Sequence, residues 1–165
     1  MIQNIILNHE EIAHKIRRIA YQIYETFVDD ETIVIAGISK NGYILAEKIA
    51  AKVQQISGLN VVLCEVYIDK QNPNKIITTS LSTDEYENKG IVLVDDVLHS
   101  GTTLIYGVRH FLGVPLKKFK TAVLVDRNYK KYPVKADFKG ISLSTSLQEH
   151  VHVVFGTEGD YAYLD

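Results

Sequence analysis

The sequence predicts an α/β fold in which a mainly parallel central sheet is flanked by helices. Several short segments are apolar and rich in β-branched residues, as strands buried on both faces are. These strand-like segments are 32–37, 60–68, 90–97 and 120–127. Apolar residues at helical spacing mark helices at 9–28, 42–57 and 102–112. Strands that alternate with helices along a chain are typical of a parallel sheet covered on both faces.

Length and composition favour one globular domain over residues 1–165. The hydrophobic fraction is 46% and the charged fraction is 23%, which excludes disorder, collagen and coiled coil. The net charge of −2 provides no global basic field for nucleic acid. The single cysteine, Cys64, cannot form an intrachain disulfide. We see no signal peptide and no apolar run near the ~18 residues of a membrane span, so we expect a cytoplasmic protein without a membrane partner.

The first helix has a clear beginning and one apolar face. Asn8 followed by Glu11 has the spacing of a capping box, in which each side chain accepts a hydrogen bond from the other residue's backbone N–H. The apolar positions that follow are Ile12, Ile16, Ile19, Ile23 and Phe27. Their spacing predicts that this face packs against the sheet.

The remaining segments are connections and weaker strands. Residues 69–90 are polar and predict a long loop or a weak hairpin, and a stretch of that length is usually functional or mobile. Residues 128–150 predict connections, with a short extended piece near Phe138. We expect VHVVFG (151–156) to close the central sheet. The C-terminal GTEGDYAYLD (156–165) is interpreted as a tail or a short edge piece.

The segment IVLVDDVLHSGTTL (91–104) carries the clearest functional pattern. A buried strand ends in Asp95 and Asp96, and a hydroxyl- and glycine-rich turn leads into a helix. The turn consists of His99, Ser100, Gly101, Thr102 and Thr103. Free N–H groups at a helix start, together with hydroxyls, bind anions, and the two carboxylates can accept hydrogen bonds from vicinal hydroxyls. A ligand with a phosphate beside a diol is a ribose 5-phosphate, which this pattern favours over simple capping of a turn and a helix.

IVLVDDVLHSGTT resembles the phosphoribosyl-pyrophosphate (PRPP) motif of type I phosphoribosyltransferases. The closest resemblance is to the pyrimidine-operon attenuation regulators that are also uracil phosphoribosyltransferases. It extends to residues 122–146 and to the first helix at 14–25. Hypoxanthine phosphoribosyltransferases share the overall plan less closely. The resemblance implies the type I phosphoribosyltransferase fold, with a small hood and a flexible loop.

The resemblance also implies roles for the acidic pair and the turn. Asp95 and Asp96 would hold the ribose 2′- and 3′-hydroxyls, and residues 99–103 would wrap the 5′-phosphate. The carboxylates would favour positive charge on the ribose during displacement at C1′, in which pyrophosphate leaves. Mg²⁺ would be carried by the pyrophosphate of PRPP, with few protein ligands and no dedicated metal site.

Residues 37–42 resemble the pyrophosphate loop of the family. Ser39, Lys40, Asn41 and Gly42 would bind PRPP, with Lys40 in contact with pyrophosphate as a catalytic residue, and the resemblance implies a cis peptide before Lys40. The regulators usually have Arg where this chain has Asn41, a departure that removes a bidentate anion contact. Residues 69–89 match the flexible loop that covers the site, and Lys70 roughly matches a family Arg.

The base would lie against residues 137–145. The resemblance places backbone groups of Lys139 and the side chain of Thr145 at the base. Asp126 and Arg127 would lie near the base or the pyrophosphate, and a structural ion pair between these two residues is an equal alternative.

The resemblance implies PRPP, a nucleobase and a nucleoside monophosphate as partners, with uracil favoured by similarity over the whole chain, and a homodimer. Basic residues could form a face for RNA, a partner that is conceivable but not expected: Arg17, Arg18, Lys117, Lys118, Lys120, Lys130 and Lys131. One alternative is a nucleotide- or RNA-binding regulator with little catalysis, which Asn41 and the short loop motivate. The other is a hypoxanthine or guanine phosphoribosyltransferase.

Overall fold

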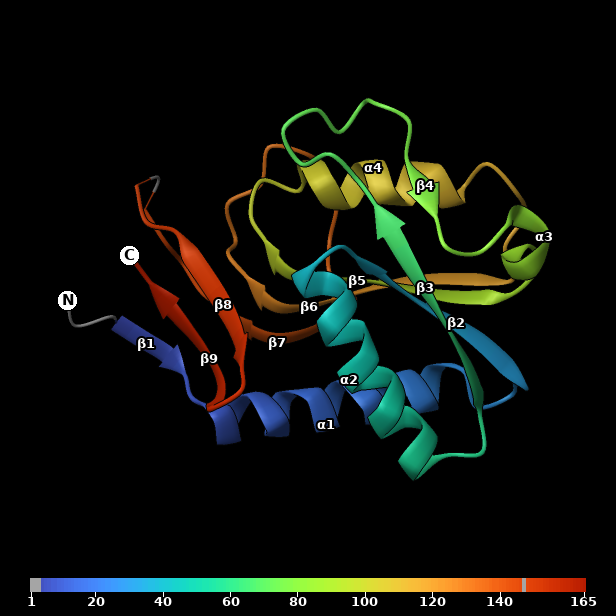
Figure 1. Ribbon diagram of the computed structural model, residues 1–165, viewed down its shortest axis with the longest axis horizontal. Coiled ribbons are helices and arrows are strands. Elements are labelled where there is room, and N and C mark those ends of the chain that lie inside the picture. The colour runs from blue at the N-terminus through green and yellow to red at the C-terminus, as the bar shows by residue number, and fades with distance from the viewer. Residues whose placement is uncertain (1–3, 147) are drawn as a thin grey trace.

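Six strands form the central sheet in the order β4-β3-β2-β5-β6-β7, and three more form a separate sheet in the order β1-β9-β8 (Figure 1). The structure is a computed structural model that describes residues 4–146 and 148–165. The helices are α1 His9–Thr26, α2 Asn41–Ile56, α3 Thr83–Tyr86 and α4 Thr102–Phe111. The strands of the central sheet are β2 Thr32–Ile38, β3 Asn60–Tyr67, β4 Thr78–Thr79, β5 Gly90–Leu98, β6 Lys118–Asp126 and β7 Phe138–Ser142. The smaller sheet consists of β1 Asn4–Leu7, β8 Val151–Gly156 and β9 Gly159–Leu164.

The central sheet is parallel except for β4, which confirms the predicted fold class. Strand order reverses between β2 and β5, because β3 follows β2 on one side and β5 pairs with β2 on the other. The carboxyl ends of strands at such a reversal enclose a crevice in which α/β proteins bind ligands. Residues 37–42 and 95–103 lie at these two strand ends.

Alternation along the strands divides the core into two layers. Ile33, Ile35 and Val92 face α1, α2 and the smaller sheet. Val34 and Leu93 face the other side of the sheet, against α4 and α3. Figure 1 shows α1 and α2 below the sheet, α4 above it and the smaller sheet at the left, where both chain ends lie. The helices and the smaller sheet thereby cover both faces and leave the carboxyl strand ends open.

The N-terminus of α1 confirms the predicted capping box. The Glu11 backbone N–H donates to Asn8 Oδ1 at 2.9 Å, and the Asn8 N–H donates to Glu11 Oε2 at 2.8 Å. Both interactions satisfy groups that a helix start otherwise leaves without partners.

Two predictions about weaker elements were wrong. Residues 151–156 do not close the central sheet: β8 pairs with β9, and β9 pairs with β1. The C-terminal segment is not a tail, because β9 is the middle strand of the smaller sheet, which forms the predicted hood. Residues 69–90 form the predicted weak hairpin, in which β4 pairs with β3, and they also contain the short helix α3.

The physical reason is that these elements depend on distant partners. The alternation of β8 buries Val151 and Val153 and suits either sheet. Strand β9 buries only Asp160 and Ala162, and β1, which we did not predict, is four residues long. Such short, half-polar strands carry little local preference for one partner.

No helix of the described segments 4–146 and 148–165 combines the length and apolar character needed to cross a bilayer.

Candidate active site

A cavity of about 280 Å³ opens at the carboxyl end of β5. It collects side chains from α2, the loop after β3, the β5–α4 segment and β8. The residues that line it are Asn41, Lys70, Asp95 through Leu104, Val123, Val151, His152 and Val153. The cavity therefore brings together the acidic pair, the hydroxyl–glycine turn and Lys70.

Asp95 and Asp96 are held by short-range contacts at the floor of this cavity. Asp95 is 3% exposed, and its Oδ1 accepts a hydrogen bond from the Asp96 N–H at 2.9 Å. Lys70 Nζ lies 3.5 Å from the same oxygen. Burial, and next the adjacent Asp96 charge, raise the pKa of Asp95 to about 8, while Lys70 opposes the shift. Asp95 is thus mostly protonated near pH 7 without a ligand, and a bound cation or hydrogen-bond donor would favour its ionised form.

The turn before α4 combines hydroxyl side chains with a glycine at the helix N-cap. Gly101 is the N-cap residue with φ +87°, and Ser100 Oγ lies 2.8 Å from Thr102 Oγ1. The carbonyl of Ser100 accepts the N–H groups of Lys131 and Tyr132 at 2.8 and 3.2 Å. A Cβ on Gly101 would lie 2.6 Å from a Val134 methyl carbon. Residues 131–134 therefore brace the turn from outside, which makes a glycine necessary there.

Residues 37–42 contribute one side chain to the cavity wall. The Ser39–Lys40 peptide is cis, which confirms that expectation. Asn41 donates from Nδ2 to Asp96 Oδ2 at 3.1 Å and to the Val153 carbonyl at 2.8 Å. Ser39, Lys40 and Gly42 are not among the residues that line the cavity. A Cβ on Gly42 would lie 2.8 Å from the Val94 carbonyl and 3.0 Å from Asp95, so the start of α2 packs directly on the end of β5.

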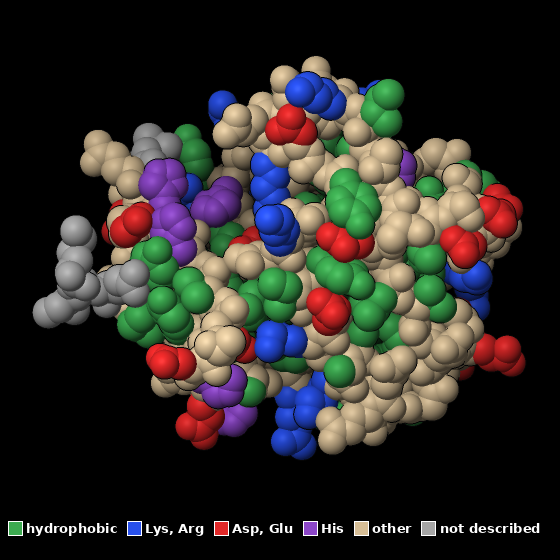
Figure 2. All heavy atoms as spheres, viewed as in Figure 1, with side chains coloured by type: hydrophobic (Ala, Val, Ile, Leu, Met, Phe, Trp, Pro, Cys, Tyr) green, Lys and Arg blue, Asp and Glu red, His purple; other side chains and the backbone are tan. Residues whose placement is uncertain are grey.

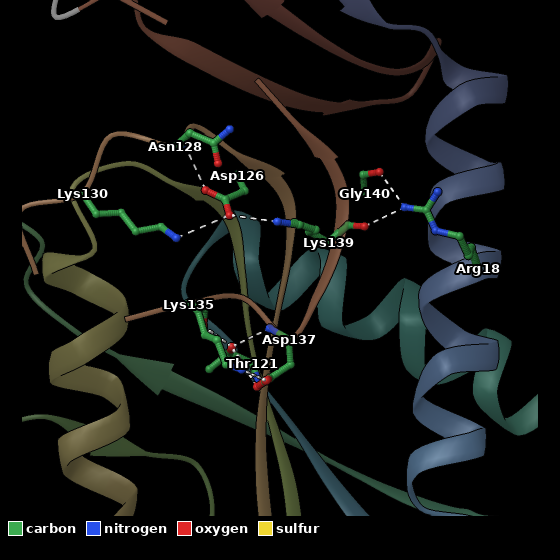
Figure 3. Close-up of polar contacts among 9 residues, drawn as sticks. All are labelled: Arg18, Thr121, Asp126, Asn128, Lys130, Lys135, Asp137, Lys139 and Gly140. Atoms are coloured by element: carbon green, nitrogen blue, oxygen red, sulfur yellow. Dashed lines mark hydrogen bonds and ion pairs between the residues drawn. The ribbon is translucent and has the colours of Figure 1, made fainter. Parts of the chain in front are cut away.

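The predicted ion pair between Asp126 and Arg127 does not form. Asp126 is 1% exposed, and its Oδ2 lies 3.6 Å from both Lys130 Nζ and Lys139 Nζ. The Asn128 N–H donates to Oδ1 of the same carboxylate at 3.0 Å. Figure 3 shows the two lysines reaching Asp126 from opposite sides. Asp126 is thus fully engaged by neighbours other than Arg127.

Arg127 is a buried cation held by neutral acceptors. It is 6% exposed, and it donates from Nε to Thr145 Oγ1 at 2.5 Å and from Nη2 to the Ser146 carbonyl at 2.6 Å. Among residues 4–146 and 148–165, no carboxylate lies within ion-pair distance of it. Its backbone N–H donates to the carbonyl of Leu98, which lines the cavity. Removing a charge from water without a counter-charge is costly, so the unbalanced charge favours an acceptor-rich ligand nearby.

His99 lies on the cavity wall beside this cation. Burial, and next the Arg127 charge, lower the pKa of His99, while Asp96 acts in the opposite direction. The imidazole is therefore neutral near pH 7 and can both donate and accept a hydrogen bond.

The two other residues predicted at the base serve as structural contacts. The Lys139 carbonyl accepts a hydrogen bond from Arg18 Nη2 at 2.6 Å, and its ammonium group pairs with Asp126. The Thr145 hydroxyl accepts the bond from Arg127. Neither Lys139 nor Thr145 is among the residues that line the cavity. Figure 3 shows Arg18 reaching from α1 to the Lys139 and Gly140 carbonyls, which fastens β7 to α1.

The sequence did not predict that β8 lines the cavity. Val151, His152 and Val153 line the cavity together with the acidic pair. Their strand was assigned to the wrong sheet, and apolar alternation contains no information about which cavity a strand borders. Only the pair of histidines, His150 and His152, distinguished this segment from an ordinary strand.

The carboxylates of the cavity fit a metal ion that binds together with a phosphate-containing ligand. The described residues contain no group of three or more His, Cys, Asp or Glu that could hold a metal ion by themselves. Mg²⁺ keeps several waters and is commonly bound by one or two carboxylates together with phosphates of the substrate. Asp95 and Asp96 meet that requirement.

The basic residues proposed as an RNA face are mostly engaged elsewhere. Arg18 binds two carbonyls, Lys117 pairs with Asp30, and Lys130 pairs with Asp126. Lys118 donates to the Thr26 carbonyl at 2.8 Å. On the face shown in Figure 2, Lys and Arg are interspersed with Asp and Glu, and the histidines gather toward the edge where Figure 1 shows β8 and β9.

Curated proteins match most of this chain in sequence. The bifunctional protein PyrR of Streptomyces coelicolor is 32% identical, over 93% of this chain and 83% of that protein. The bifunctional protein PyrR of Macrococcus caseolyticus is 30% identical, over 97% of this chain and 96% of that protein.

Solved structures match in fold. A hypoxanthine phosphoribosyltransferase from Trypanosoma cruzi superposes with a TM-score of 0.75 at 18% identity, over 86% of this chain and 82% of that one. A hypoxanthine-guanine phosphoribosyltransferase from Bacillus anthracis gives a TM-score of 0.73 at 21% identity, over 87% and 84% of the two chains. The family model described as a phosphoribosyl transferase domain matches residues 3–161. This chain therefore belongs to the phosphoribosyltransferase family.

Proposed function

We propose that this protein transfers the 5-phosphoribosyl group from PRPP to a nucleobase, most favourably uracil, and releases pyrophosphate. The single observation that carries the proposal is the shared cavity of the acidic pair and the hydroxyl–glycine turn. One end of the cavity accepts hydrogen bonds and the other donates them, which suits a ribose with a 5′-phosphate. The proposal treats residues 1–165 as a single domain.

The reaction would use the acidic pair and the hydroxyl–glycine turn of the cavity. Residues 99–103 bind the 5′-phosphate through backbone N–H groups and hydroxyls, and Asp95 and Asp96 accept the ribose hydroxyls. Ligand hydroxyls and Lys70 offset the burial of the Asp95 carboxylate. The two carboxylates then stabilise the positive charge that grows on the ribose as the bond from C1′ to pyrophosphate breaks.

Contacts with the pyrophosphate would come from both loops beside the cavity. Lys40 and the backbone of residues 39–42 would approach from the segment after β2, and Lys70 would approach from the loop after β3. When bound with PRPP, Mg²⁺ would neutralise charge on the pyrophosphate, with Asp95 and Asp96 as the available protein ligands. Closure of the flexible loop in residues 69–89 over the ligand would exclude water and protect PRPP from hydrolysis.

The base would lie toward Arg127 and His99. Arg127 offers only donors, and a neutral imidazole can match either kind of partner. Asp126, Lys139 and Thr145 would not contact the base. They would hold the neighbouring segments in place, and Thr145 would hold Arg127. A base with carbonyl oxygens fits this set better than one with amino groups alone. Similarity to the PyrR proteins favours uracil among such bases.

A second candidate is a regulator that binds nucleotide or RNA with little turnover. The relatives named bifunctional protein PyrR favour a second role besides catalysis. The engaged basic residues argue against a large RNA surface on this chain alone. Hypoxanthine or guanine remains the alternative base.

The resemblance also supports a cytoplasmic location and a homodimer through the face near residues 37–42. Sedimentation equilibrium measures the dimer directly, with an expected mass of twice the chain mass of 18.6 kDa.

The test is product formation with a panel of bases. Uracil, hypoxanthine, guanine, adenine and xanthine are each supplied with PRPP and Mg²⁺, and the nucleotide product is identified by chromatography. Uridine monophosphate from uracil alone supports the proposal. A purine nucleotide would keep the mechanism and change the substrate. Binding of nucleotide without any product would favour the regulator.

A further inference from the structure

Asn41 connects three parts of the molecule at the cavity. It is the first residue of α2, and its Nδ2 lies 3.1 Å from Asp96 Oδ2 on β5 and 2.8 Å from the Val153 carbonyl on β8. An asparagine side chain has two N–H donors, and each contact uses one of them. Neither donor is left for a phosphate.

The contact with β8 fixes the orientation of the Asn41 amide. Strand β8 belongs to the smaller sheet, so its carbonyl approaches Asn41 from outside the central sheet. The backbone of α2 is fixed from the other side, because Gly42 packs against Val94 and Asp95 without space for a Cβ. Asn41 therefore has a defined position before any ligand binds.

Asp96 is held on both oxygens by neutral donors. Oδ1 accepts the Val97 backbone N–H at 2.9 Å, and Oδ2 accepts the Asn41 amide. Each carboxylate oxygen can accept more than one hydrogen bond, so lone pairs remain for a ligand. Asp95 differs, because Lys70 contributes a positive charge to it. A neutral amide fixes the Asp96 carboxylate without compensating its charge.

We propose that Asn41 is a positioning residue that acts through Asp96: its side chain holds that carboxylate toward the ribose and does not itself bind PRPP. The inference rests on the proposed function for the identity of the ligand. An arginine at this position would bring a cation against Asp96 and reduce the charge available to the ribose. Asparagine orients the Asp96 carboxylate and leaves its negative charge uncompensated.

A double-mutant cycle tests this role. Binding of PRPP with Mg²⁺ is measured by calorimetry for wild type, Asn41→Ala, Asp96→Asn and the double variant. Loss of a hydrogen bond to a charged group should weaken binding about tenfold in Asn41→Ala. If Asn41 acts only through Asp96, the double variant binds as weakly as Asp96→Asn alone. If the double variant instead binds PRPP more weakly than Asp96→Asn, by the factor that Asn41→Ala causes alone, Asn41 contributes independently of Asp96. That result would overturn the inference.

The control is Asn60→Ala. Asn60 is exposed on β3, and its Nδ2 lies 3.3 Å from Thr32 Oγ1, away from the cavity. We expect its affinity for PRPP to equal that of wild type, and thermal unfolding shows whether each variant is folded. A folded wild type that does not bind PRPP overturns the proposed function together with this inference. If wild type binds PRPP and the affinity losses of the two single variants multiply in the double variant, only this inference is overturned.

Discussion

The ionised form of Asp95 that the proposed reaction needs lowers the stability of the folded protein. Asp95 is buried beside a second carboxylate, and both features raise its pKa. The folded-state pKa of about 8 lies above the ordinary value of 3.8, so the folded protein binds this proton more tightly than the unfolded chain does. Stability therefore falls as the pH rises from about 4 to about 8.

We predict that Asp95→Asn stabilises the protein at high pH. The variant has no carboxylate to desolvate, so it should be more stable than wild type by about 1–3 kcal/mol at pH 9. The difference should shrink toward zero at pH 4. Urea unfolding at pH 4, 7 and 9 measures it, and a constant offset at all three pH values would contradict the assignment. Asp84→Asn, at an exposed position where Ser82 lowers the pKa, should give no such gain.

Arg127 and His99 are predicted to be coupled electrostatically. The Arg127 charge is the second largest cause of the lowered pKa of His99. Arg127→Gln should therefore raise the pKa of His99 toward its ordinary value, because one repelling cation is gone. An NMR titration of the imidazole measures this shift, and Arg109→Gln on α4 serves as the control. If the pKa of His99 does not change in Arg127→Gln, the Arg127 guanidinium does not act on the His99 imidazole.

Sequence predicted the site residues unevenly. The acidic pair and residues 99–103 were found because they are contiguous and their chemistry is local. The partners of Asn41 and Arg127 were not found, because those contacts join residues far apart in the chain. Asp126 pairs with Lys130 four residues away and with Lys139, and the sequence did not distinguish these partners from Arg127. The charge of an isolated Asp-Arg pair favours a salt bridge, but nearby lysines and hydroxyls provided other partners.

Among the elements, the contact between α2 and β5 places residues 37–42 against the acidic pair. Its closeness depends on Gly42, where a Cβ would lie 2.8 Å from the Val94 carbonyl. Gly42→Ala should move α2 or β5, lower stability by about 1–3 kcal/mol and weaken PRPP binding. Chemical unfolding and calorimetry measure the two effects.

Gly58→Ala is the matched control for that prediction. A Cβ at Gly58 meets nothing within 4 Å. Its stability should stay within about 0.5 kcal/mol of wild type, and its PRPP affinity should not change. Equal losses in both variants would show that the packing at Gly42 is not the cause.

The long buried strands and helices were predictable, whereas the smaller sheet was not. Strands β2, β5 and β6 are almost continuously buried, so composition alone reveals them. The smaller sheet joins β1 at one end of the chain to β8 and β9 at the other. Its strands gain their stability from each other and from α1 and α2, and such pairings leave a weak local pattern.

For the whole molecule, the cavity forms where the two sheets meet. Residues of β5 and β8 both line it, and Asn41 is hydrogen-bonded to Asp96 on β5 and to the Val153 carbonyl on β8. A ligand there binds the folded chain and not the unfolded one. PRPP with Mg²⁺ at 100 times its dissociation constant should raise the free energy of unfolding by about 2.7 kcal/mol. Thermal unfolding with and without PRPP measures this, and an unchanged midpoint would contradict the site.

The most direct test of the central claim is pyrophosphate release from PRPP and Mg²⁺ with uracil, in wild type and in the variant with Asp95→Asn and Asp96→Asn. We predict release by wild type that depends on uracil. We also predict a loss of at least about a hundredfold in the variant, which stays folded but cannot stabilise charge on the ribose. Equal release by both proteins would contradict the role of the acidic pair, and no release by a folded wild type would contradict the proposed transferase activity.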